Sequence, residues 1–516
     1  AQRLAQALAN QERILVIGDF DADGATSTAL AVAALKAMGA TDINYLVPNR
    51  FTYGYGLTPQ IVELAKTKNP HLIITVDNGI SSTEGVQRAH ELNIDVLITD
   101  HHLAGKELPS ACIIVNPNQP NDTFPSKAIA GVGVIFYVML ALRSYLLTNN
   151  WFEKRQLPIP VMAQFLDLVA LGTVADVVSL DKNNRILVHQ GLGRIRKGAA
   201  RPGIQALLQI ARREAAQLSA NDLGFALAPR LNAAGRLDDM SLGINCLLAE
   251  DSVSAYQMAL QLEQLNNERR ELEAEMQKQA FAIVERMHFT TQLPVGLCLY
   301  DPSWHQGIVG LVASRVKDKT CRPVIAFARV DGGNLKASAR SVTGIHIRDC
   351  LENIAAAHHE ILQKFGGHAM EAGLTIKEKD FKHFAQLFAA EVEKQSQGNE
   401  FNAGIESDGE LATQHLNLEL AQILRNGGPW GSAFPEPCFD GIFEIIDQRL
   451  VGQKHLKLLL KLPDSPYYHD AIAFSIDPEQ WPNHRAQRVH CVYKLDVNEY
   501  QNRQRLQLLI EELEAV

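Results

Sequence analysis

The chain has 516 residues, of which 46% are hydrophobic and 21% charged, and this balance excludes wholesale disorder. Its net charge of −9, from 49 Lys and Arg against 58 Asp and Glu, excludes a generally basic nucleic-acid binder but leaves room for a local basic groove. At roughly 150 residues per domain, the length predicts three or four domains.

The cysteines and the apolar stretches indicate the compartment. Seven cysteines are spread singly, without a Cys-x-x-Cys pair, which argues against a disulfide framework or a zinc ribbon and favours a reducing compartment. The most apolar stretch, residues 128–142, is about 15 residues long, whereas a membrane span needs about 20. With no signal peptide recognised, we expect a cytoplasmic protein without membrane contact. Because the sequence begins at Ala1 without methionine, we also expect a segment before it.

Residues 14–115 alternate short apolar runs with helical stretches. The runs are continuous, as in strands covered on both faces, and lie at 14–17, 43–47, 72–76, 96–99 and 113–115. Helices are expected at 26–38, after Thr58 and at 82–92. This order predicts a parallel sheet with helices on both faces, extended by a helical region over 128–250.

Residues 252–293 contain neither Gly nor Pro. They predict a helix of about 35 residues, roughly 50 Å long. Its apolar stripe fits either a coiled-coil dimer or a helix that bridges two domains, and we expect a monomer.

The second half of the chain predicts two further domains. Runs at 295–300, 309–317 and 324–328 indicate a second α/β domain. After a loop rich in Gly and Pro, the pattern changes to short strands only, which predicts a small β-barrel; they lie at 439–446, 456–462, 470–476, 489–495 and 506–510. We therefore divide the chain into a first α/β domain (1–250), a connecting helix (251–290), a second α/β domain (291–400) and a barrel domain (401–516).

Three predicted strands of the first domain end in acidic or imidazole groups. Since open parallel sheets gather their sites at the carboxyl ends of strands, these side chains are expected at one edge. They are Asp19, Asp21 and Asp23 after the first strand, Asp77 after the third, and Asp100, His101 and His102 after the fourth. A further carboxylate, Asp176, follows an apolar run.

These carboxylates need a source of positive charge. Two of them about 4 Å apart repel by about 4 kcal/mol at an effective dielectric of about 20, and no Lys or Arg lies in these motifs. Two divalent ions would balance the four charges of Asp21, Asp23, Asp77 and Asp176, and oxygen-rich ligation with an imidazole suits Mn²⁺ or Mg²⁺. Such an ion pair is a device for phosphoryl hydrolysis. A single Asp after a strand is more often a helix cap, but the whole set favours a metal site.

At these motifs the chain resembles the DHH phosphoesterases, named for the Asp100-His101-His102 type of motif. The acidic motifs alone indicate the superfamily. Five further motifs and the terminal barrel are similar to those of the family's exonucleases specific for single strands, in which the barrel is an OB-fold. These motifs are residues 230–236, 304–307, 338–341 and 366–368 and the Gly-Pro-Trp-Gly loop at 428–431. The resemblance implies a DHH domain and a second α/β domain joined by the long helix, followed by the OB-fold.

The resemblance also implies residue roles. Asp21 and Asp23 would each hold a metal, Asp77 would bridge the two ions, and His101 and Asp176 would complete the ligand set. Asp19 and Asp100 would orient ligands, and His102 would contact phosphate or support the ligands. The family's phosphate contacts would fall on His368 and, for the terminal 5′ phosphate, on Ser338 and Arg340, with Arg50, Arg230 and Arg236 as further candidates.

Residue chemistry agrees with the expected phosphate grip. Ser338 and Arg340 are two apart, so on a strand both face the same side, and a hydroxyl with a guanidinium suits phosphate. In the barrel, basic residues stand near aromatic ones, which suits single strands, although a solvated charged face over a barrel core is the alternative. These residues are Arg449, Lys454, Lys457, Lys461, Arg503 and Arg505, with Tyr467, Tyr468, Trp481 and Tyr493.

The resulting hypothesis is a 5′-to-3′ exonuclease that hydrolyses single-stranded DNA to 5′-mononucleotides with two ions of Mn²⁺ or Mg²⁺. Single-strand specificity would come from a gap between the two α/β domains. The resemblance implies roles in recombination and repair, with a single-stranded DNA-binding protein and a repair helicase as partners. The alternatives are a phosphodiesterase for dinucleotides or short RNA, or a pyrophosphatase, and a replication scaffold without catalysis.

Overall fold

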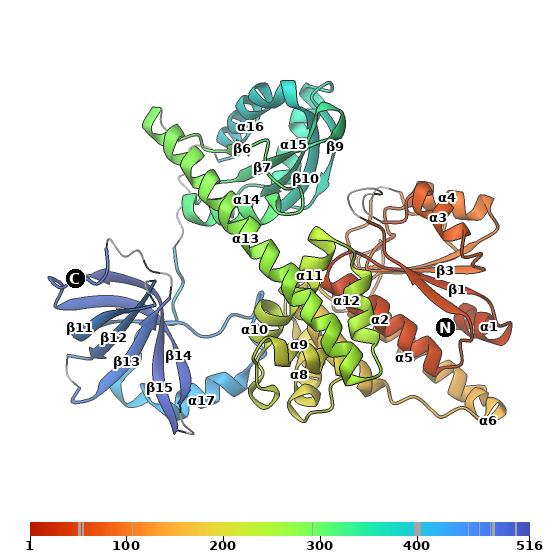
Figure 1. Ribbon diagram of the computed structural model, residues 1–516, viewed down its shortest axis with the longest axis horizontal. Helices are drawn as coiled ribbons and strands as arrows, with labels where there is room; N and C mark the ends of the chain where they lie inside the picture. The colour runs from red at the N-terminus through yellow and green to blue at the C-terminus, as the bar shows by residue number, and fades with distance from the viewer. Residues whose placement is uncertain are drawn as a thin grey trace. The chain divides into compact units, whose positions relative to one another are not determined.

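The computed structural model describes residues 1–49, 53, 56–105, 107–290, 293–396, 404–452, 454–463, 465–474, 476, 480–500 and 503–516 (Figure 1). The chain separates into two compact units. Unit 1 comprises residues 1–231, 240–259 and 405–516, and unit 2 comprises residues 232–239 and 260–404. The predicted fold class is confirmed in both units.

Unit 1 contains a parallel five-stranded sheet in the order β2-β1-β3-β4-β5. The strands are β1 (Ile14–Ile17), β2 (Ile43–Leu46), β3 (Leu72–Val76), β4 (Asp95–Thr99) and β5 (Ile113–Val115). Every residue of β1 and β3 is buried, because helices cover both faces of the sheet. Figure 1 shows α3 (Pro59–Lys66) and α4 (Thr83–Glu91) on one side and α2 (Ala22–Ala37) and α5 (Gly131–Thr148) on the other.

Helix α2 begins four residues earlier than the sequence predicted. Asp21 is its N-cap, and the Asp21 side chain accepts a hydrogen bond from the backbone N–H of Gly24. The acidic motif after β1 therefore ends inside the first turn of the helix.

The predicted helical region follows the sheet. Its helices are α5, α6 (Trp151–Arg155), α7 (Leu166–Ala175), α8 (Lys182–Arg196), α9 (Pro202–Ile210), α10 (Ala220–Asp222), α11 (Ala228–Leu237) and α12 (Ser241–Leu248), and α1 (Gln2–Ala9) precedes β1. A π-helical turn over Leu223–Leu227 joins α10 to α11. Helices α2, α5 and α7 pack against one another, and most of their apolar residues are buried.

Helix α5 is longer than the predicted apolar stretch. It continues past Arg143 through Tyr145, Leu146 and Leu147 and reaches 18 residues. Among the described residues it is the one helix that is long and apolar enough to cross a membrane by length and composition, with a mean hydropathy of 1.6. More than half of it is buried within the fold, as in the core helix of a domain, so this is weak evidence for a span.

The predicted long helix is α13 (Ser252–Thr290), with 39 residues. Its first two turns belong to unit 1 and the remainder to unit 2, which agrees with the bridging interpretation. Met276, Ile283 and Met287 of its apolar stripe pack in a core with Trp304 and helix α14 (Val309–Thr320). The stripe is therefore covered by the chain itself along this part of the helix.

Unit 2 contains a mixed sheet in the order β6-β7-β8-β10-β9. The strands are β6 (Leu297–Tyr300), β7 (Val324–Val330), β8 (Asn334–Arg340), β9 (Leu362–Gly367) and β10 (Glu371–Lys377). Strands β6 and β7 are parallel and the others pair antiparallel. Helices α15 (Ile347–Ala357) and α16 (Phe381–Ser396) pack on this sheet around Phe384 and Phe388.

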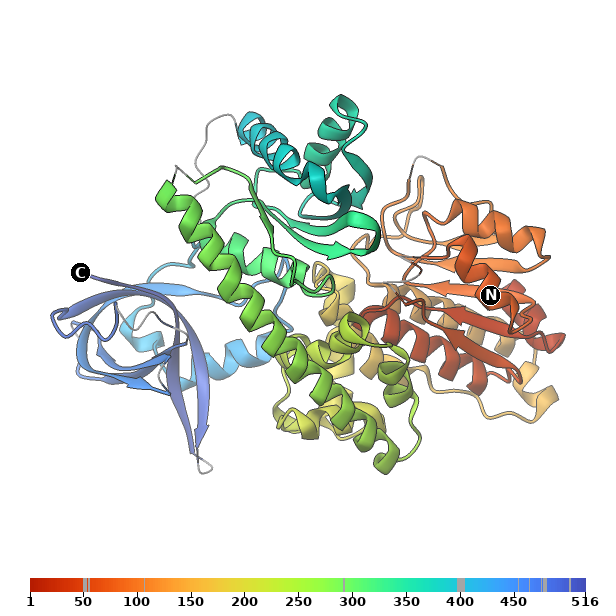
Figure 2. The same cartoon turned by 45° about the horizontal axis from the view of Figure 1, so that its top comes forward.

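The C-terminal part of unit 1 is a closed barrel in the order β11-β12-β13-β15-β14 (Figure 2). Its strands are β11 (Phe439–Val451), β12 (His455–Lys461), β13 (Tyr468–Ala473), β14 (Arg488–Tyr500) and β15 (Arg503–Ala515), and α17 (Leu418–Gly427) precedes them. Tyr493 and Trp481 lie in the barrel core, so the expectation that they offer stacking surfaces is wrong. Tyr467 and Tyr468 are exposed and remain candidates.

Candidate metal centre

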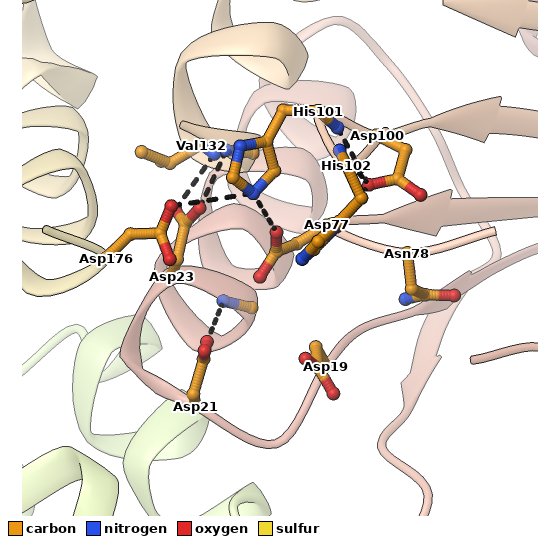
Figure 3. Close-up of polar contacts among 12 residues, drawn as sticks. Asp19, Asp21, Asp23, Asp77, Asn78, Asp100, His101, His102, Val132 and Asp176 are labelled. Carbon is orange, nitrogen blue, oxygen red and sulfur yellow. Dashed lines mark hydrogen bonds and ion pairs between the residues drawn. The ribbon is translucent and has the colours of Figure 1, made fainter. Parts of the chain in front are cut away.

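The acidic and imidazole groups predicted at the strand ends lie together at the carboxyl edge of the first sheet (Figure 3). The Asp21 side chain accepts a hydrogen bond of 2.9 Å from Gly24 N through one carboxylate oxygen, Oδ1. Helix capping and metal ligation are therefore compatible at this residue, because the second oxygen is not used by the cap. Asp19, which precedes it, is buried, and its Oδ1 accepts from Phe20 N at 2.8 Å.

Asp23 is held by the start of helix α5. Its Oδ2 accepts from Gly131 N at 2.7 Å and its Oδ1 accepts from Val132 N at 3.0 Å. Burial raises the pKa of Asp23 to about 7, and the charge of Asp21 adds to this, although the two amides act in the opposite direction. The carboxylate is thus firmly oriented but short of positive charge.

Asp77 occupies a constrained position directly after β3. Its φ of +62° lies in the left-handed region, and its side chain is 2% exposed. Burial, followed by the charges of Asp23 and Asp21, raises the pKa of Asp77 well above its usual value. Helix α5 also approaches this side chain, because a Cβ on Gly131 would lie 2.6 Å from Asp77 Oδ1.

His101 joins two of the acidic segments. Its Nε2 lies 3.1 Å from Asp77 Oδ1 and 3.5 Å from Asp176 Oδ2. Asp176 follows the last residue of helix α7, so a helix outside the sheet supplies this carboxylate. The backbone carbonyl of His101 accepts a hydrogen bond of 2.6 Å from the Asn118 side chain, which holds the loop after β4.

Asp100 organises the double histidine. Its Oδ1 accepts from the backbone N–H groups of His101 and His102 and lies 2.7 Å from His102 Nδ1, while its Oδ2 accepts from Ile80 N. Burial opposes its ionisation, but the hydrogen bond and charge of His102 and the backbone amides together lower the pKa of Asp100. Burial favours the neutral imidazole of His102, but the pKa of His102 is nevertheless raised to about 9. The causes are the hydrogen bond to Asp100, the charge of Asp100 and the charges of Asp19 and Asp21.

The donor atoms fit divalent cations. Three groups each have ligand atoms within 4.8 Å of one another: Asp19, Asp21 and Asp77; Asp23, His101 and Asp176; and Asp77, His101 and His102. Asp77 belongs to two groups, as expected of a carboxylate whose two oxygens can each serve one of two adjacent ions; His101 also belongs to two groups, but its Nε2 has one lone pair and would bind one ion. Carboxylate oxygens with imidazole suit Mn²⁺ or Mg²⁺, and cations would supply the positive charge that Asp23 and Asp77 lack.

The residues predicted to bind phosphate in unit 2 lie near one corner of its sheet. Ser338 and Arg340 share a face of β8, as predicted, and face the start of α14, where a Cβ on Gly310 would be 3.4 Å from Ser338 Oγ. Arg340 Nη2 lies 3.0 Å from a carboxylate oxygen of Glu371, its partner in the β8–β10 register. His368 N donates to Glu371 O at 2.7 Å, so His368 belongs to the same corner.

The other candidate arginines have different surroundings. Arg230 is 6% exposed and donates to the carbonyl of Ala226, within its own helical segment. Arg236 Nη1 donates to Gly307 O at 3.3 Å. Arg50 lies outside the described residues.

Sequence reasoning missed the amides of Gly131 and Val132 and the Glu371 carboxylate. The only sequence signal for the two amides was a glycine at the start of an apolar helix, because any residue type can supply a backbone N–H donor. Glu371 stands three residues after His368, and only strand pairing brings it to Arg340.

Comparisons with known proteins agree with this architecture. Residues 13–173 match the model of the DHH family N-terminal domain, which contains every residue of the candidate metal centre except Asp176. Residues 289–394 match the DHHA1 domain, and residues 407–512 match the RecJ OB domain. The resemblance inferred from the sequence motifs is confirmed.

Similar proteins define the family more narrowly. The chain is 54% identical over 511 residues to the single-stranded-DNA-specific exonuclease RecJ of Dickeya dadantii, covering 99% of this chain and 89% of that protein. It is 51% identical to RecJ of Escherichia coli over 97% of this chain and 87% of that protein. The chain belongs to the RecJ family of single-stranded-DNA-specific exonucleases.

Solved structures show the same fold. Thermus thermophilus RecJ in complex with Mn²⁺ superimposes with a TM-score of 0.80 at 27% identity, covering 100% of this chain and 71% of that one. An exonuclease RecJ bound to manganese matches with a TM-score of 0.62 at 32% identity, over 78% of this chain and 94% of that one.

Proposed function

We propose that this chain is a metal-dependent exonuclease that degrades single-stranded DNA in the 5′-to-3′ direction and releases 5′-mononucleotides. The observation that carries the proposal is the sharing of the Asp77 carboxylate between neighbouring groups of ligand atoms, which suits two adjacent divalent ions. Family membership and the Mn²⁺ and Mg²⁺ complexes of Thermus thermophilus RecJ support it.

The proposed ligands are the carboxylates and imidazole that the strand ends bring together. Asp21, Asp23, His101 and Asp176 would hold the ions, and Asp77 would bridge them. Bound Mn²⁺ or Mg²⁺ would lower the pKa of a coordinated water and stabilise the charge that develops on the phosphoryl group.

The surrounding residues have positioning roles in this proposal. The amides of Gly131 and Val132 hold Asp23, and Asp100 holds the rings and backbone of the double histidine. Asp19, His102 and Asp100 would support the ligands or contact the reacting phosphate. No serine or cysteine nucleophile lies within these motifs, so the attacking group would be water.

Polarity would come from recognition of the chain end. Ser338 and Arg340 would bind the terminal 5′ phosphate, with His368 contacting phosphate nearby, and Arg230, Arg236 and Arg50 would be additional contacts. The Arg340–Glu371 ion pair would open when a phosphate with a stronger charge arrives.

The barrel would bind the strand away from the cleaved end. Tyr467 and Tyr468 are exposed by 66% and 59% and would stack on bases. Of the basic residues proposed for the barrel, Lys457 and Lys461 already have acidic neighbours, Asp470 and Glu444. Arg449, Lys454, Arg503 and Arg505 are therefore the favoured phosphate contacts.

Degradation of end-labelled oligonucleotides tests the proposal. A 5′-phosphorylated single strand labelled at its 5′ end should release labelled mononucleotide at once in Mn²⁺, whereas a 3′ label should stay on progressively shorter fragments. Chelator and Asp77→Ala should abolish both. Release of the 3′ label first, full activity of Asp77→Ala, or preference for dinucleotides over a 40-mer would contradict the proposal.

We also propose a cellular setting for this activity. As a cytoplasmic monomer in recombination and repair, the chain would act on strands supplied by a repair helicase and coated by a single-stranded DNA-binding protein. Light scattering of the purified chain tests the monomer, and degradation rates with and without each partner test the cooperation.

A further inference from the structure

The connector from α7 to α8 begins with the proposed metal ligand Asp176. Directly after it, Val177 has a φ of +60° and its side chain is 70% exposed. A β-branched residue rarely adopts this conformation, and such strain persists only where the surroundings hold the backbone in place. The contacts of the connector therefore bear on where Asp176 points.

Two anchors come from the DHH domain itself. The Asn184 side chain is buried and donates to Ser179 O at 2.9 Å and to Ala128 O at 2.8 Å. Asp181 caps helix α8 and accepts a hydrogen bond from Ser126 Oγ at 2.6 Å. These contacts fix the connector on both sides of Leu180 but do not bond the backbone N–H of Leu180.

The third anchor is the loop of residues 428–437, which precedes the barrel and lies in the same compact unit. Leu180 N donates to Ser432 O at 2.8 Å. Leu180 O accepts from Arg185 Nη1 at 2.7 Å, and the Arg185 guanidinium lies 4.1 Å from the ring centre of Phe434. The backbone N–H of the buried Leu180 thus bonds directly to this docking loop, and its carbonyl bonds to a guanidinium that packs on the loop's Phe434.

The docking loop is itself well braced. Phe434 stacks on Trp430 with ring centres 5.0 Å apart, and Trp430 Nε1 donates to Leu424 O at 2.8 Å. Gly431 and Phe434 exchange two backbone hydrogen bonds. A Cβ on Gly431 would lie 2.8 Å from Leu180 Cδ1, so glycine allows the loop backbone to approach the connector.

We propose that the docking loop is a positioning element for Asp176, through which the C-terminal part of the chain sets the affinity of one metal position. The inference rests on the proposed function, because it takes Asp176 as a ligand. The affected position is the one with ligand atoms from Asp23, His101 and Asp176. Phe434 and Arg185 act as positioning residues, since they contact the connector rather than the ion.

Direct Mn²⁺ binding by the full chain, without DNA, tests the inference. The free Mn²⁺ signal in electron paramagnetic resonance reports bound equivalents, and the wild type should bind two. Phe434→Ala should weaken the affinity for one of the two Mn²⁺ ions about tenfold and leave the affinity for the other unchanged. Tenfold is the lower end of the range for residues that orient ligands. Phe434→Tyr, which keeps the ring, should restore wild-type binding, and Phe474→Ala, the same truncation at an exposed barrel residue, should not alter it.

The outcomes separate the two hypotheses. If Phe434→Ala does not fold, as thermal melting in chelator would show, Arg185→Gln takes its place with the same expectation. Unchanged Mn²⁺ binding in a folded variant, or equal weakening of both equivalents, would overturn the positioning role while leaving the exonuclease proposal intact. A wild-type chain that binds no Mn²⁺ would refute the proposed function, and the inference with it.

Discussion

Gly131→Ala should separate the geometry of the metal centre from its chemistry. Gly131 supplies only a backbone amide to Asp23, and alanine keeps that amide. The added methyl, however, would lie 2.6 Å from Asp77 Oδ1 and 2.9 Å from Asp77 Cγ. Ordinary contact begins at 3.4 Å, and Asp77 Cβ would also lie only 2.7 Å away, so Asp77 or the start of α5 must move by up to about 0.8 Å.

A displacement of this size has a large expected effect on rate. Misplacement of a reacting group by about 1 Å can reduce the rate about 100-fold, which corresponds to about 2.7 kcal/mol of lost transition-state stabilisation. We therefore expect kcat on a 5′-phosphorylated single strand in saturating Mn²⁺ to fall by about two orders of magnitude. No ligand atom is removed, so DNA binding measured in chelator should be unchanged.

The matched control is Gly193→Ala in helix α8. A Cβ there meets nothing within 4 Å, so the change should leave kcat unaltered and raise helix stability by about 0.5–1 kcal/mol. Wild-type kcat for Gly131→Ala, with its melting temperature also unchanged, would refute the claim that close approach of α5 sets the Asp77 position.

Three further substitutions probe other parts of the proposal. Asp100→Asn should reduce kcat about 10- to 100-fold. It should also lower the pKa of His102 from about 9, because the Asp100 carboxylate favours the protonated imidazole. An NMR titration of the metal-free chain that shows no decrease in the His102 pKa would contradict this expectation. Arg340→Ala should reduce the preference for 5′-phosphorylated over 5′-hydroxyl ends, measured as a ratio of kcat/KM, while Arg329→Ala, an arginine on β7 paired with Glu378, should not. Tyr467→Ala should weaken the binding of single-stranded DNA in chelator by about 1–3 kcal/mol, measured by fluorescence anisotropy, without altering Mn²⁺ binding. If the variant binds single-stranded DNA as tightly as the wild type, stacking at Tyr467 is excluded.

Local sequence patterns were enough to locate the first sheet, the long helix and the candidate metal centre. Continuous apolar runs identified the buried strands, and the absence of Gly and Pro identified helix α13. Asp19, Asp77 and Asp100 could be placed together because the carboxyl ends of neighbouring parallel strands share one edge of a sheet. Alternation also predicted that Ser338 and Arg340 face the same side of β8, since strand geometry is local.

The contacts that hold those groups in place come from long-range packing, which no local pattern reports. Gly131 is 108 residues from Asp23, and no local pattern reports which helix start will meet which carboxylate. Tyr493 and Trp481 carry the same composition signal as Tyr467, yet barrel closure turns them inward. The contact of Phe434 with Arg185 likewise depends on how distant segments pack. Sequence periodicity encodes which side of an element is buried. The orientation of one element against another is set by the complementarity of the two surfaces that meet.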